Sequence, residues 1–282
     1  MITFKALGYD GRLGNQMFQF ATTYGTAKRL GYKAFFPIEN CSNYIGTGPQ
    51  GIIDSSNMRV KCDLLDCFDV PQDYFIPGNQ IQVIYNYREP HFNYDPNILS
   101  IPDSTNLNGY FQTSKYFSEF REELSKEIFR FKPEVENKAI QYWDSTVKQF
   151  LNGSTPVSLH VRRTDYVAKA DFHAPCSMDY YTQAVSRFDG SNKFLVFSDD
   201  LKWCKENFNG PQYLVVETGD PYVDLRLQNM CVHHIIANST FSWWAAWLNL
   251  NEEKIVICPS VWFGPASREN YSDVCPEDWI KI

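Results

Sequence analysis

The sequence predicts an α/β protein of two domains, each with a parallel sheet. Residues 153–282 alternate short apolar runs with helix-like stretches, the rhythm of a parallel sheet covered on both faces. The chain opens with a similar pattern of apolar run, glycine-rich turn and helical stripe. With 282 residues and 44% apolar composition, the chain can form one large domain or two ordinary ones, and we expect two.

The first predicted strand covers residues 2–7, and a glycine-rich turn from Gly8 to Gly14 follows it. A helix is predicted over residues 16–30, because apolar residues recur there at three- and four-residue spacing. Strand, turn and helix form the first unit of an α/β layer.

The region between this unit and the regular second half is less clearly patterned. Residues 40–110 are rich in Pro, Asn, Asp and Gly and contain only short β-like runs. Residues 118–151 are charged and helical, and a turn-rich segment ends this stretch. We therefore expect domains at residues 1–152 and 153–282.

In the second half, the apolar runs predict five strands and the stretches between them predict four helices. The strands are expected at 157–161, 194–198, 213–216, 233–237 and 254–258, and the helices at 177–188, 200–208, 222–231 and 241–250. Ligands of such sheets bind beyond the carboxyl ends of the strands, so the residues that follow each strand are the candidates for chemistry.

Charge and hydropathy exclude several classes of function. A net charge of −7 and a pI near 5.3 argue against a nucleic-acid-binding protein, which would use Lys and Arg to neutralise phosphates. No apolar run approaches the roughly 20 residues of a membrane span, and the amino terminus lacks a signal-peptide layout, so we expect a cytoplasmic protein. The eight cysteines have no paired CxxC spacing, which indicates neither a zinc site nor a disulfide framework.

The first candidate cluster follows the strand at 157–161. Arg162 and Arg163 carry planar forks that can bind a diphosphate in bidentate fashion, and Asp165 can orient one of them. A surface ion pair is the alternative, but the position at a strand end favours a binding site.

The second cluster, Ser198, Asp199 and Asp200, follows the strand at 194–198. These acids can accept hydrogen bonds from a base or ribose, hold a divalent metal, or cap the next helix. The sequence does not clearly supply the further carboxylates that a metal site would need.

The third cluster joins the strand at 233–237 to a helix that begins near Ser239. The first turn of such a helix offers backbone N–H groups, hydroxyls and the positive end of the dipole, which together form a phosphate cradle. The same residues can also serve only as a helix cap.

A fourth segment, Gly11 to Gln16, is weak evidence by itself because it is not a GxGxxG pattern. Taken together, however, four segments in this order closely resemble the α-1,2-fucosyltransferase family. These segments are Gly11 to Ala21, His160 to Tyr166, Phe197 to Asp200 and Asn238 to Leu248.

The resemblance implies a GT-B fold of two facing Rossmann-like domains. It implies that the carboxyl-terminal domain holds GDP-fucose and that a galactose-terminated glycan approaches from the amino-terminal domain. Fucose would pass to the 2-hydroxyl of a terminal β-galactose with inversion, with no required metal and no cofactor beyond the donor. Peripheral contact with lipid-linked glycans, without a transmembrane segment, fits this expectation.

The resemblance also implies residue roles. Arg162 should hold the β-phosphate and offset charge on the departing GDP. Asn15 matches an asparagine that faces the acceptor in protein O-fucosyltransferases. Asp171 and His173 are both candidates for the base, because the match to core α-1,6-fucosyltransferases needs a one-residue shift. The donor site is expected to comprise His160, Arg162, Arg163, Asp165, Ser198, Asp199, Asp200, Asp224, Asn238, Ser239, Thr240 and Phe241, and the acceptor-side loop Arg12, Gly14, Asn15 and Gln16.

Other functions stay open at this point. The chain could use another nucleotide sugar or transfer fucose to protein. A non-catalytic nucleotide- or glycan-binding protein is a further alternative. A hydrolase is disfavoured because the sequence lacks a nucleophile motif such as GxSxG.

Overall fold

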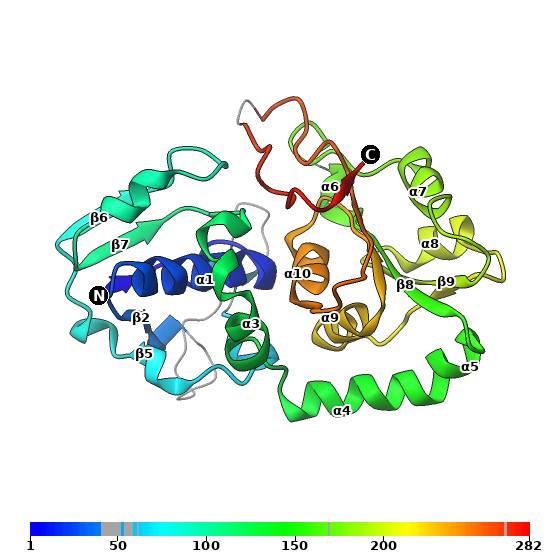
Figure 1. The fold of residues 1–282 in the computed structure, drawn as a ribbon, viewed down its shortest axis with the longest axis horizontal. Coiled ribbons are helices and arrows are strands. Elements are labelled where there is room, and N and C mark those ends of the chain that lie inside the picture. The colour runs from blue at the N-terminus through cyan, green and yellow to red at the C-terminus, as the bar shows by residue number, and fades with distance from the viewer. Residues whose placement is uncertain (41–51, 54–58, 61, 169, 268–269) are drawn as a thin grey trace. The chain divides into compact units, whose positions relative to one another are not determined.

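The computed structural model describes residues 1–40, 52–53, 59–60, 62–168, 170–267 and 270–282. The chain divides into two compact units (Figure 1). Unit 1 comprises Met1–Arg130 and Glu269–Pro276, and unit 2 comprises Phe131–Arg268 and Glu277–Ile282. Both contain a parallel sheet, which confirms the predicted α/β class. Residues 131–152 group with unit 2, and the predicted boundary after residue 152 stays a prediction.

Unit 1 contains a five-stranded sheet in the order β5-β2-β1-β7-β6, with every described pairing parallel. The first strand is shorter than the predicted run over 2–7, because the chain turns from Lys5 and Gly8 adopts a φ of 87°. The strands are β1 Ile2–Thr3, β2 Ala34–Pro37, β5 Phe75–Ile76, β6 Tyr85–Arg88 and β7 Thr105–Asn108.

Helix α1 (Leu13–Arg29) forms the core of unit 1, and every residue from Gln16 to Ala27 is buried. Phe20 on this helix stacks on Phe36 of β2 with ring centroids 4.4 Å apart. A Cβ at Gly25 would lie 2.7 Å from the Tyr116 carbonyl oxygen, so a larger residue would push that segment away.

The remaining elements of unit 1 are short. Part of the poorly patterned region over 40–110 lies outside the described residues. The short elements are an antiparallel pair, β3 (Ile52–Ile53) and β4 (Arg59–Val60), helices α2 (Leu64–Cys67) and α3 (Arg121–Glu123), a π-helical turn at Leu124–Ile128, and 3-10 turns at Ile38–Asn40, Gln72–Tyr74, Gly78–Gln80, Pro96–Ser100, Ser114–Tyr116 and Ser118–Phe120.

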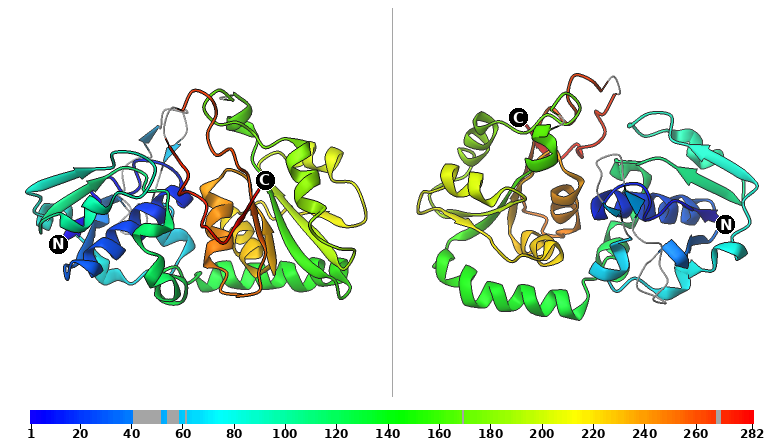
Figure 2. Two further views of the ribbon diagram at one scale, coloured as in Figure 1. Left: turned by 45° about the horizontal axis from the view of Figure 1, so that its top comes forward. Right: turned by 180° about the vertical axis from the view of Figure 1, so that it is seen from behind.

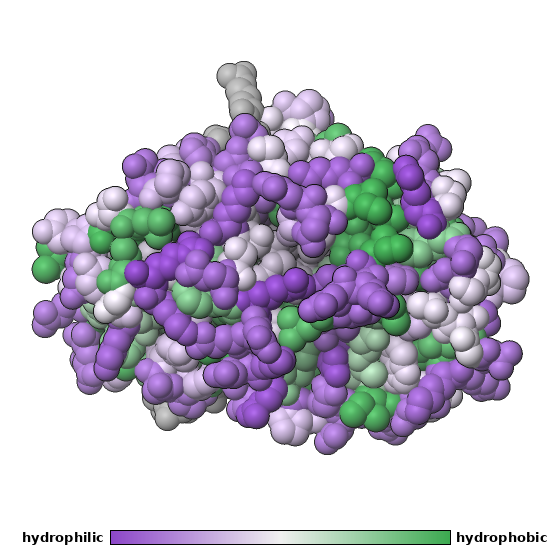
Figure 3. Space-filling view, in the orientation of Figure 1, coloured by the Kyte–Doolittle hydropathy of each residue, from purple (hydrophilic) through white to green (hydrophobic). Residues whose placement is uncertain are grey.

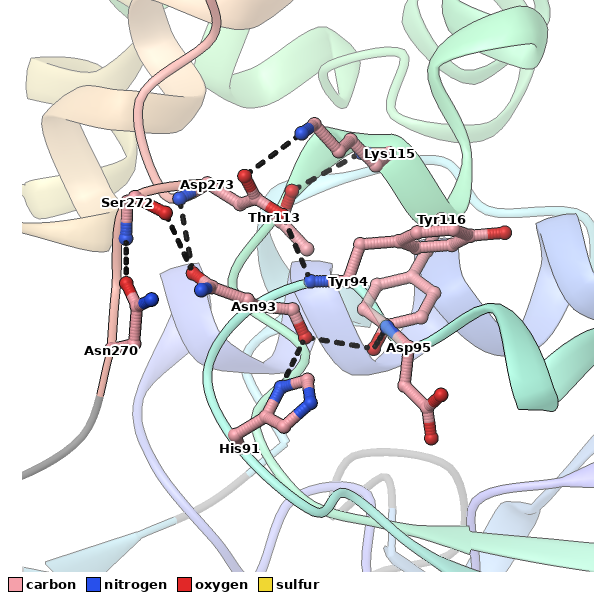
Figure 4. A network of polar contacts seen from close by, with 10 residues as sticks. All are labelled: His91, Asn93, Tyr94, Asp95, Thr113, Lys115, Tyr116, Asn270, Ser272 and Asp273. Carbon is pink, nitrogen blue, oxygen red and sulfur yellow. Dashed lines mark hydrogen bonds and ion pairs between the residues drawn. The ribbon is translucent and has the colours of Figure 1, made fainter.

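A segment near the carboxyl terminus completes unit 1 (Figure 4). The Asp273 backbone N–H donates to Asn93 Oδ1 at 3.1 Å. The Asp273 carboxylate accepts from the backbone N–H of Tyr94 at 3.1 Å and from Lys115 Nζ at 2.8 Å. These polar contacts fix the segment to the residues before β7 and to those after it.

Unit 2 contains a six-stranded parallel sheet in the order β10-β9-β8-β11-β12-β13. In chain order within the unit this is 3-2-1-4-5-6, the order of a dinucleotide-binding Rossmann sheet. The strands are β8 Thr155–Val161, β9 Asn192–Ser198, β10 Tyr213–Val215, β11 His233–Ile235, β12 Val256–Cys258 and β13 Ile280–Lys281.

Helices cover both faces of this sheet (Figure 2). Because side chains alternate along β9, Phe194 and Val196 pack in one core with α7 and α8 residues, whereas Leu195 and Phe197 pack in another with α4 and α9 residues. The helices are α4 Pro133–Tyr142, continued by a π-helical turn at Trp143–Val147 and by α5 Lys148–Leu151, then α6 Thr164–Ala168, α7 Met178–Val185, α8 Leu201–Asn207, α9 Pro221–Met230 and α10 Thr240–Leu248.

The face of the molecule in Figure 3 is mainly hydrophilic, with hydrophobic residues confined to small areas. Among the described residues, no helix combines the length and apolar character needed to cross a bilayer.

Candidate functional site

The candidate site of unit 2 lies at the carboxyl edge of its sheet. Strands β8 and β11 are neighbours, and the strand order reverses between them. The residues just after these strands therefore occupy the switch point, where sheets of this order bind nucleotides. Arg162 follows β8 there, and Ser239 follows β11.

Arg162 is held by two carboxylates and one aromatic ring. Its Nη2 lies 2.5 Å from Asp165 Oδ1, and its Nη1 lies 3.1 Å from Asp199 Oδ2. Its guanidinium carbon lies 5.5 Å from the centre of the Tyr166 ring. These contacts fix the direction of the guanidinium fork, while 18% of the side chain stays exposed.

The Asp199 carboxylate holds the segment from Arg162 to Thr164 in place. It also accepts hydrogen bonds from the Arg163 backbone N–H, at 2.9 Å, and from the Thr164 hydroxyl. Burial raises the pKa of Asp199, but Arg162 and these two hydrogen bonds outweigh that effect and lower it. Asp199 is therefore ionised at neutral pH and ties the end of β9 to the end of β8.

Asp200 has a different function from Asp199. Its Oδ1 accepts a hydrogen bond from the Trp203 backbone N–H at 3.1 Å, which caps α8, as one of the sequence alternatives predicted. Its other oxygen pairs with Arg163 Nε at 3.3 Å, and the Arg163 guanidinium lies 4.2 Å from the centre of the Trp203 ring. The Ser198 hydroxyl accepts from the Asp200 backbone N–H at 2.9 Å, so this group shapes the strand-to-helix turn.

The amino terminus of α10 follows β11 at the same edge of the sheet. Ser239 is the N-cap residue, but its side chain makes no capping hydrogen bond. The helical bonding begins with the Trp243 backbone N–H, which donates to the Ser239 carbonyl at 3.0 Å. The amides of the first turn, which includes Thr240 and Phe241, precede this bond and have no partner within the helix. They are therefore suited to an anionic ligand.

His160 is the buried polar group closest in sequence to Arg162. Its side chain is 5% exposed, and its ring lies 5.7 Å from that of Phe241. Burial lowers the pKa of His160 to about 3, so the ring is neutral at physiological pH. Its Nδ1 has no hydrogen-bond partner among the described residues. Donor contact by His160 stays a prediction.

Asp224 lies on the first turn of α9. Its carboxylate accepts a hydrogen bond of 2.5 Å from the Thr218 hydroxyl. Burial raises the pKa of Asp224 to about 6, which Thr218 opposes and Asp220 reinforces. Among the described residues, the contacts of its carboxylate do not join it to Arg162.

The two candidates for the base lie on one loop but in different settings. His173 stacks on Tyr166, with ring centroids 4.5 Å apart and planes 13° apart. Asp171 is exposed, and its carbonyl oxygen accepts from the Ala266 backbone N–H at 2.9 Å. A Cβ at Gly264 would lie 2.4 Å from that same oxygen, so glycine permits this close approach of two loops.

Asn238 holds these loops together, a role that the sequence analysis missed. Its Nδ2 donates to the carbonyl oxygens of Ala174 and Trp262, each at 2.9 Å. Its Oδ1 accepts from Cys176 Sγ at 3.6 Å, and the residue is 2% exposed. The side chain thus uses its hydrogen-bonding groups within the protein, and donor contact by Asn238 stays a prediction.

The predicted acceptor-side loop opens α1 in unit 1. Gln16 is fully buried, donates through Nε2 to the Gly11 carbonyl at 3.0 Å and accepts from the Asp63 backbone N–H at 2.7 Å. The side chain of Asn15 is half-buried, and its Oδ1 accepts from Gln112 Nε2 at 3.0 Å. Arg12 is the N-cap residue of α1, and Gly14 is buried within the first turn. Asn15 therefore fits a ligand contact, whereas Gln16 shapes the loop.

No arrangement for a metal was found within the described ranges: they contain no group of three or more His, Cys, Asp or Glu side chains placed to hold an ion. The acids near Arg162 are instead engaged with arginine and with backbone groups.

The chain is similar to known glycosyltransferases in sequence and in fold. The chain is 27% identical to "Alpha-1,2-colitosyltransferase" of Escherichia coli, over 96% of each chain. It is 28% identical to "Galactoside alpha-(1,2)-fucosyltransferase 2" of Hylobates lar, over 87% of this chain and 72% of the relative. In fold it resembles NodZ alpha-1,6-fucosyltransferase, solved from a crystal soaked with GDP-fucose, with a TM-score of 0.52 and 13% identity over 88% of this chain and 91% of NodZ.

A family model extends this similarity over nearly the whole chain. The model described as glycosyl transferase family 11 matches residues 3–282, a range that includes all four segments on which the sequence resemblance rests. The chain belongs to glycosyl transferase family 11.

Proposed function

We propose that this protein is an inverting α-1,2-fucosyltransferase, which moves L-fucose from GDP-β-L-fucose to the 2-hydroxyl of a terminal β-galactose. The observation that carries this proposal is that Arg162 follows β8 and the amino terminus of α10 follows β11. These two strands flank the switch point. The α-1,2 linkage and the galactoside come from the names of the relatives, and the donor from the ligand soaked into NodZ.

Stabilisation of the leaving group is the main chemistry that these residues can provide. When the bond between fucose and the β-phosphate breaks, negative charge grows on the phosphate oxygens. A fixed guanidinium at Arg162 and the first-turn amides of α10 stabilise that charge more in the transition state than in the ground state. Because these groups supply the positive charge, the proposed mechanism needs no metal ion.

Four further predicted donor residues divide into two pairs: one pair fits the nucleoside part of the ligand, and the other supports the diphosphate. The neutral ring of His160 and the carboxyl group of Asp224 could hydrogen-bond to the base or ribose. Arg163 and Asp165 are proposed to support the diphosphate indirectly, since Asp165 orients Arg162 and Arg163 ties β8 to α8.

Deprotonation of the acceptor hydroxyl is assigned to the loop that carries Asp171 and His173. Asp171 is exposed and can approach an incoming sugar, whereas His173 is partly covered by its stacking on Tyr166. A general base contributes about 100-fold to 10,000-fold, so it supplements leaving-group stabilisation. We further propose that units 1 and 2 are the two Rossmann-like domains of a GT-B enzyme and that Asn15 contacts the acceptor.

The test is transfer from GDP-fucose to lactose in the presence of EDTA, with the linkage of the product determined by NMR. We expect an α-fucose on the galactose 2-hydroxyl and no loss of rate with EDTA. A parallel reaction with nucleotide-activated colitose is the matched donor control, because one relative is named a colitosyltransferase. Transfer of colitose alone would overturn the donor, and saturable GDP-fucose binding without transfer to any glycan would overturn the activity.

A further inference from the structure

Tyr166 lies at the meeting point of three parts of the proposed site. Its ring contacts the Arg162 guanidinium at 5.5 Å and stacks on His173 at 4.5 Å. Its hydroxyl donates to the backbone carbonyl of Asn238 at 3.0 Å. One side chain thus contacts the candidate cation, a candidate base and the strand-to-helix turn that leads into α10.

The hydroxyl contact bears directly on the position of α10. The Asn238 carbonyl belongs to the peptide that joins this residue to Ser239, the N-cap of α10. The side chain of Asn238 is already fixed by Ala174 and Trp262, so the peptide has little freedom to move on that side. The Tyr166 hydroxyl therefore ties the first helix after β8 to a peptide that is itself anchored.

The contact between the Tyr166 ring and the Arg162 guanidinium forms the other end of this link. Arg162 has ion pairs with Asp165 and Asp199, which fix the fork but not its separation from α10. Because Tyr166 contacts both Arg162 and the peptide before Ser239, it spans that separation. A cation and a helix terminus can share one diphosphate only if their spacing matches the ligand to within about 0.5 Å.

We propose that Tyr166 is a positioning residue that holds Arg162 and the amino terminus of α10 at the spacing of one diphosphate. This inference rests on the proposed function, because it assumes that both groups bind the same GDP moiety. It assigns Tyr166 no contact with the reacting atoms.

The decisive variant is Tyr166→Phe, which removes the bond to Asn238 but keeps the ring contacts with Arg162 and His173. We expect GDP to bind about fivefold to tenfold more weakly, the effect of losing one hydrogen bond. GMP lacks the β-phosphate and should bind within about twofold of wild type. Calorimetric titration with GDP and with GMP measures both affinities, and the kcat for fucose transfer should fall with the GDP affinity.

Tyr180→Phe provides a matched control on the same sheet edge. The Tyr180 hydroxyl also donates to backbone carbonyls, those of Ile236 at 2.5 Å and Ile257 at 3.3 Å, and its ring packs on that of Tyr181 with centroids 5.1 Å apart. This variant should lower the thermal midpoint of unfolding because a buried carbonyl loses a donor. Its ratio of GDP to GMP affinity should match that of wild type.

The outcomes separate this inference from the proposed function. If Tyr166→Phe keeps the wild-type ratio of GDP to GMP affinity, or if Tyr180→Phe lowers that ratio equally, the positioning role is wrong while the proposed function stands. If the wild-type protein binds neither nucleotide, the proposed donor is wrong and the inference falls with it. Only a selective loss of GDP affinity in Tyr166→Phe supports the inference.

Discussion

Helices α1 and α10 each begin after a sheet strand, and side chains hold the loops before them in different ways. At α1, the side chains of Gln16 and Gln19 fold back and donate to the carbonyls of Gly11 and Asp10, so the loop before the helix is closed on itself. At α10, the side chain of Asn238, the residue before the N-cap, instead donates to the carbonyls of two other loops.

The difference lies in how far each loop is held by its own residues. The α1 loop is closed by its own glutamines, and it is further tied to Asp63 through Gln16 and to Gln112 through Asn15. The α10 turn is held by Tyr166 and by the loops that Asn238 anchors, and it has Arg162 close by. Under the proposed function, the first loop would meet an uncharged acceptor, and the second would meet a charged leaving group whose contacts must act together.

The largest effect that this comparison predicts is for Arg162→Ala. Transfer from GDP-fucose should lose at least about 100-fold to 1,000-fold in kcat/KM, the range for removal of a preorganised donor to a developing negative charge. The protein should still fold, because Arg162 is partly exposed and Asp199 keeps its bonds to Arg163 and Thr164. Steady-state kinetics and thermal unfolding measure the two effects.

The neighbouring Arg163→Ala is the matched variant, since both side chains are similarly exposed and paired with acids. We expect a much smaller loss of kcat/KM there, because Arg163 packs on Trp203 and pairs with the residue that caps α8. Equal losses in the two variants would contradict the assignment of the β-phosphate to Arg162.

The α1 loop gives a second prediction: substitution of two adjacent residues should affect activity in one case and stability in the other. Asn15→Ala should lower transfer to lactose about tenfold or more, with GDP affinity unchanged, if it contacts the acceptor. Gln16→Ala should instead lower the free energy of unfolding by about 1–3 kcal/mol, because the partly buried Gly11 carbonyl and Asp63 N–H lose the buried Gln16 side chain as their partner. Kinetics and urea unfolding of both variants test this, and loss of GDP affinity in Asn15→Ala would oppose an acceptor role.

Much of unit 2 could be predicted from the sequence. The predicted strand at 194–198 corresponds to β9 (Asn192–Ser198), and the predicted helix at 222–231 corresponds to α9 (Pro221–Met230). These elements are long enough for periodicity and are bounded by turn residues. By contrast, β13 has two residues and no period, so only its pairing with β12 reveals it.

Contacts within the candidate site could be predicted only between residues that are close in sequence. Arg162 and Asp165 are three residues apart, and both follow a strand, which is a local signal. The bond from Tyr166 to Asn238 spans 72 residues, and the bond from Asn238 to Ala174 spans 64. No local pattern encodes such pairs, so the sequence indicated that Asn238 was near the donor but not what its side chain does.

A third helix start, that of α9, extends the comparison and gives the smallest predicted effect. Its N-cap Asp220 accepts from the Tyr222 N–H at 3.1 Å, yet Asp224 in the same turn is half-buried, and this partial burial raises its pKa to about 6. An acid whose pKa is raised by folding destabilises the protein above that pKa. The penalty is lost as the pH falls from about 6 toward the unfolded value near 4.

Asp224→Asn removes this charge and keeps an oxygen for the Thr218 hydroxyl. The variant should exceed wild type in free energy of unfolding by about 1–3 kcal/mol at pH 8, and the difference should shrink as the pH falls from about 6 to 4. Urea unfolding of both proteins across this range measures it. A difference that does not change with pH would contradict this prediction. It would mean that burial of the Asp224 charge does not destabilise the folded protein.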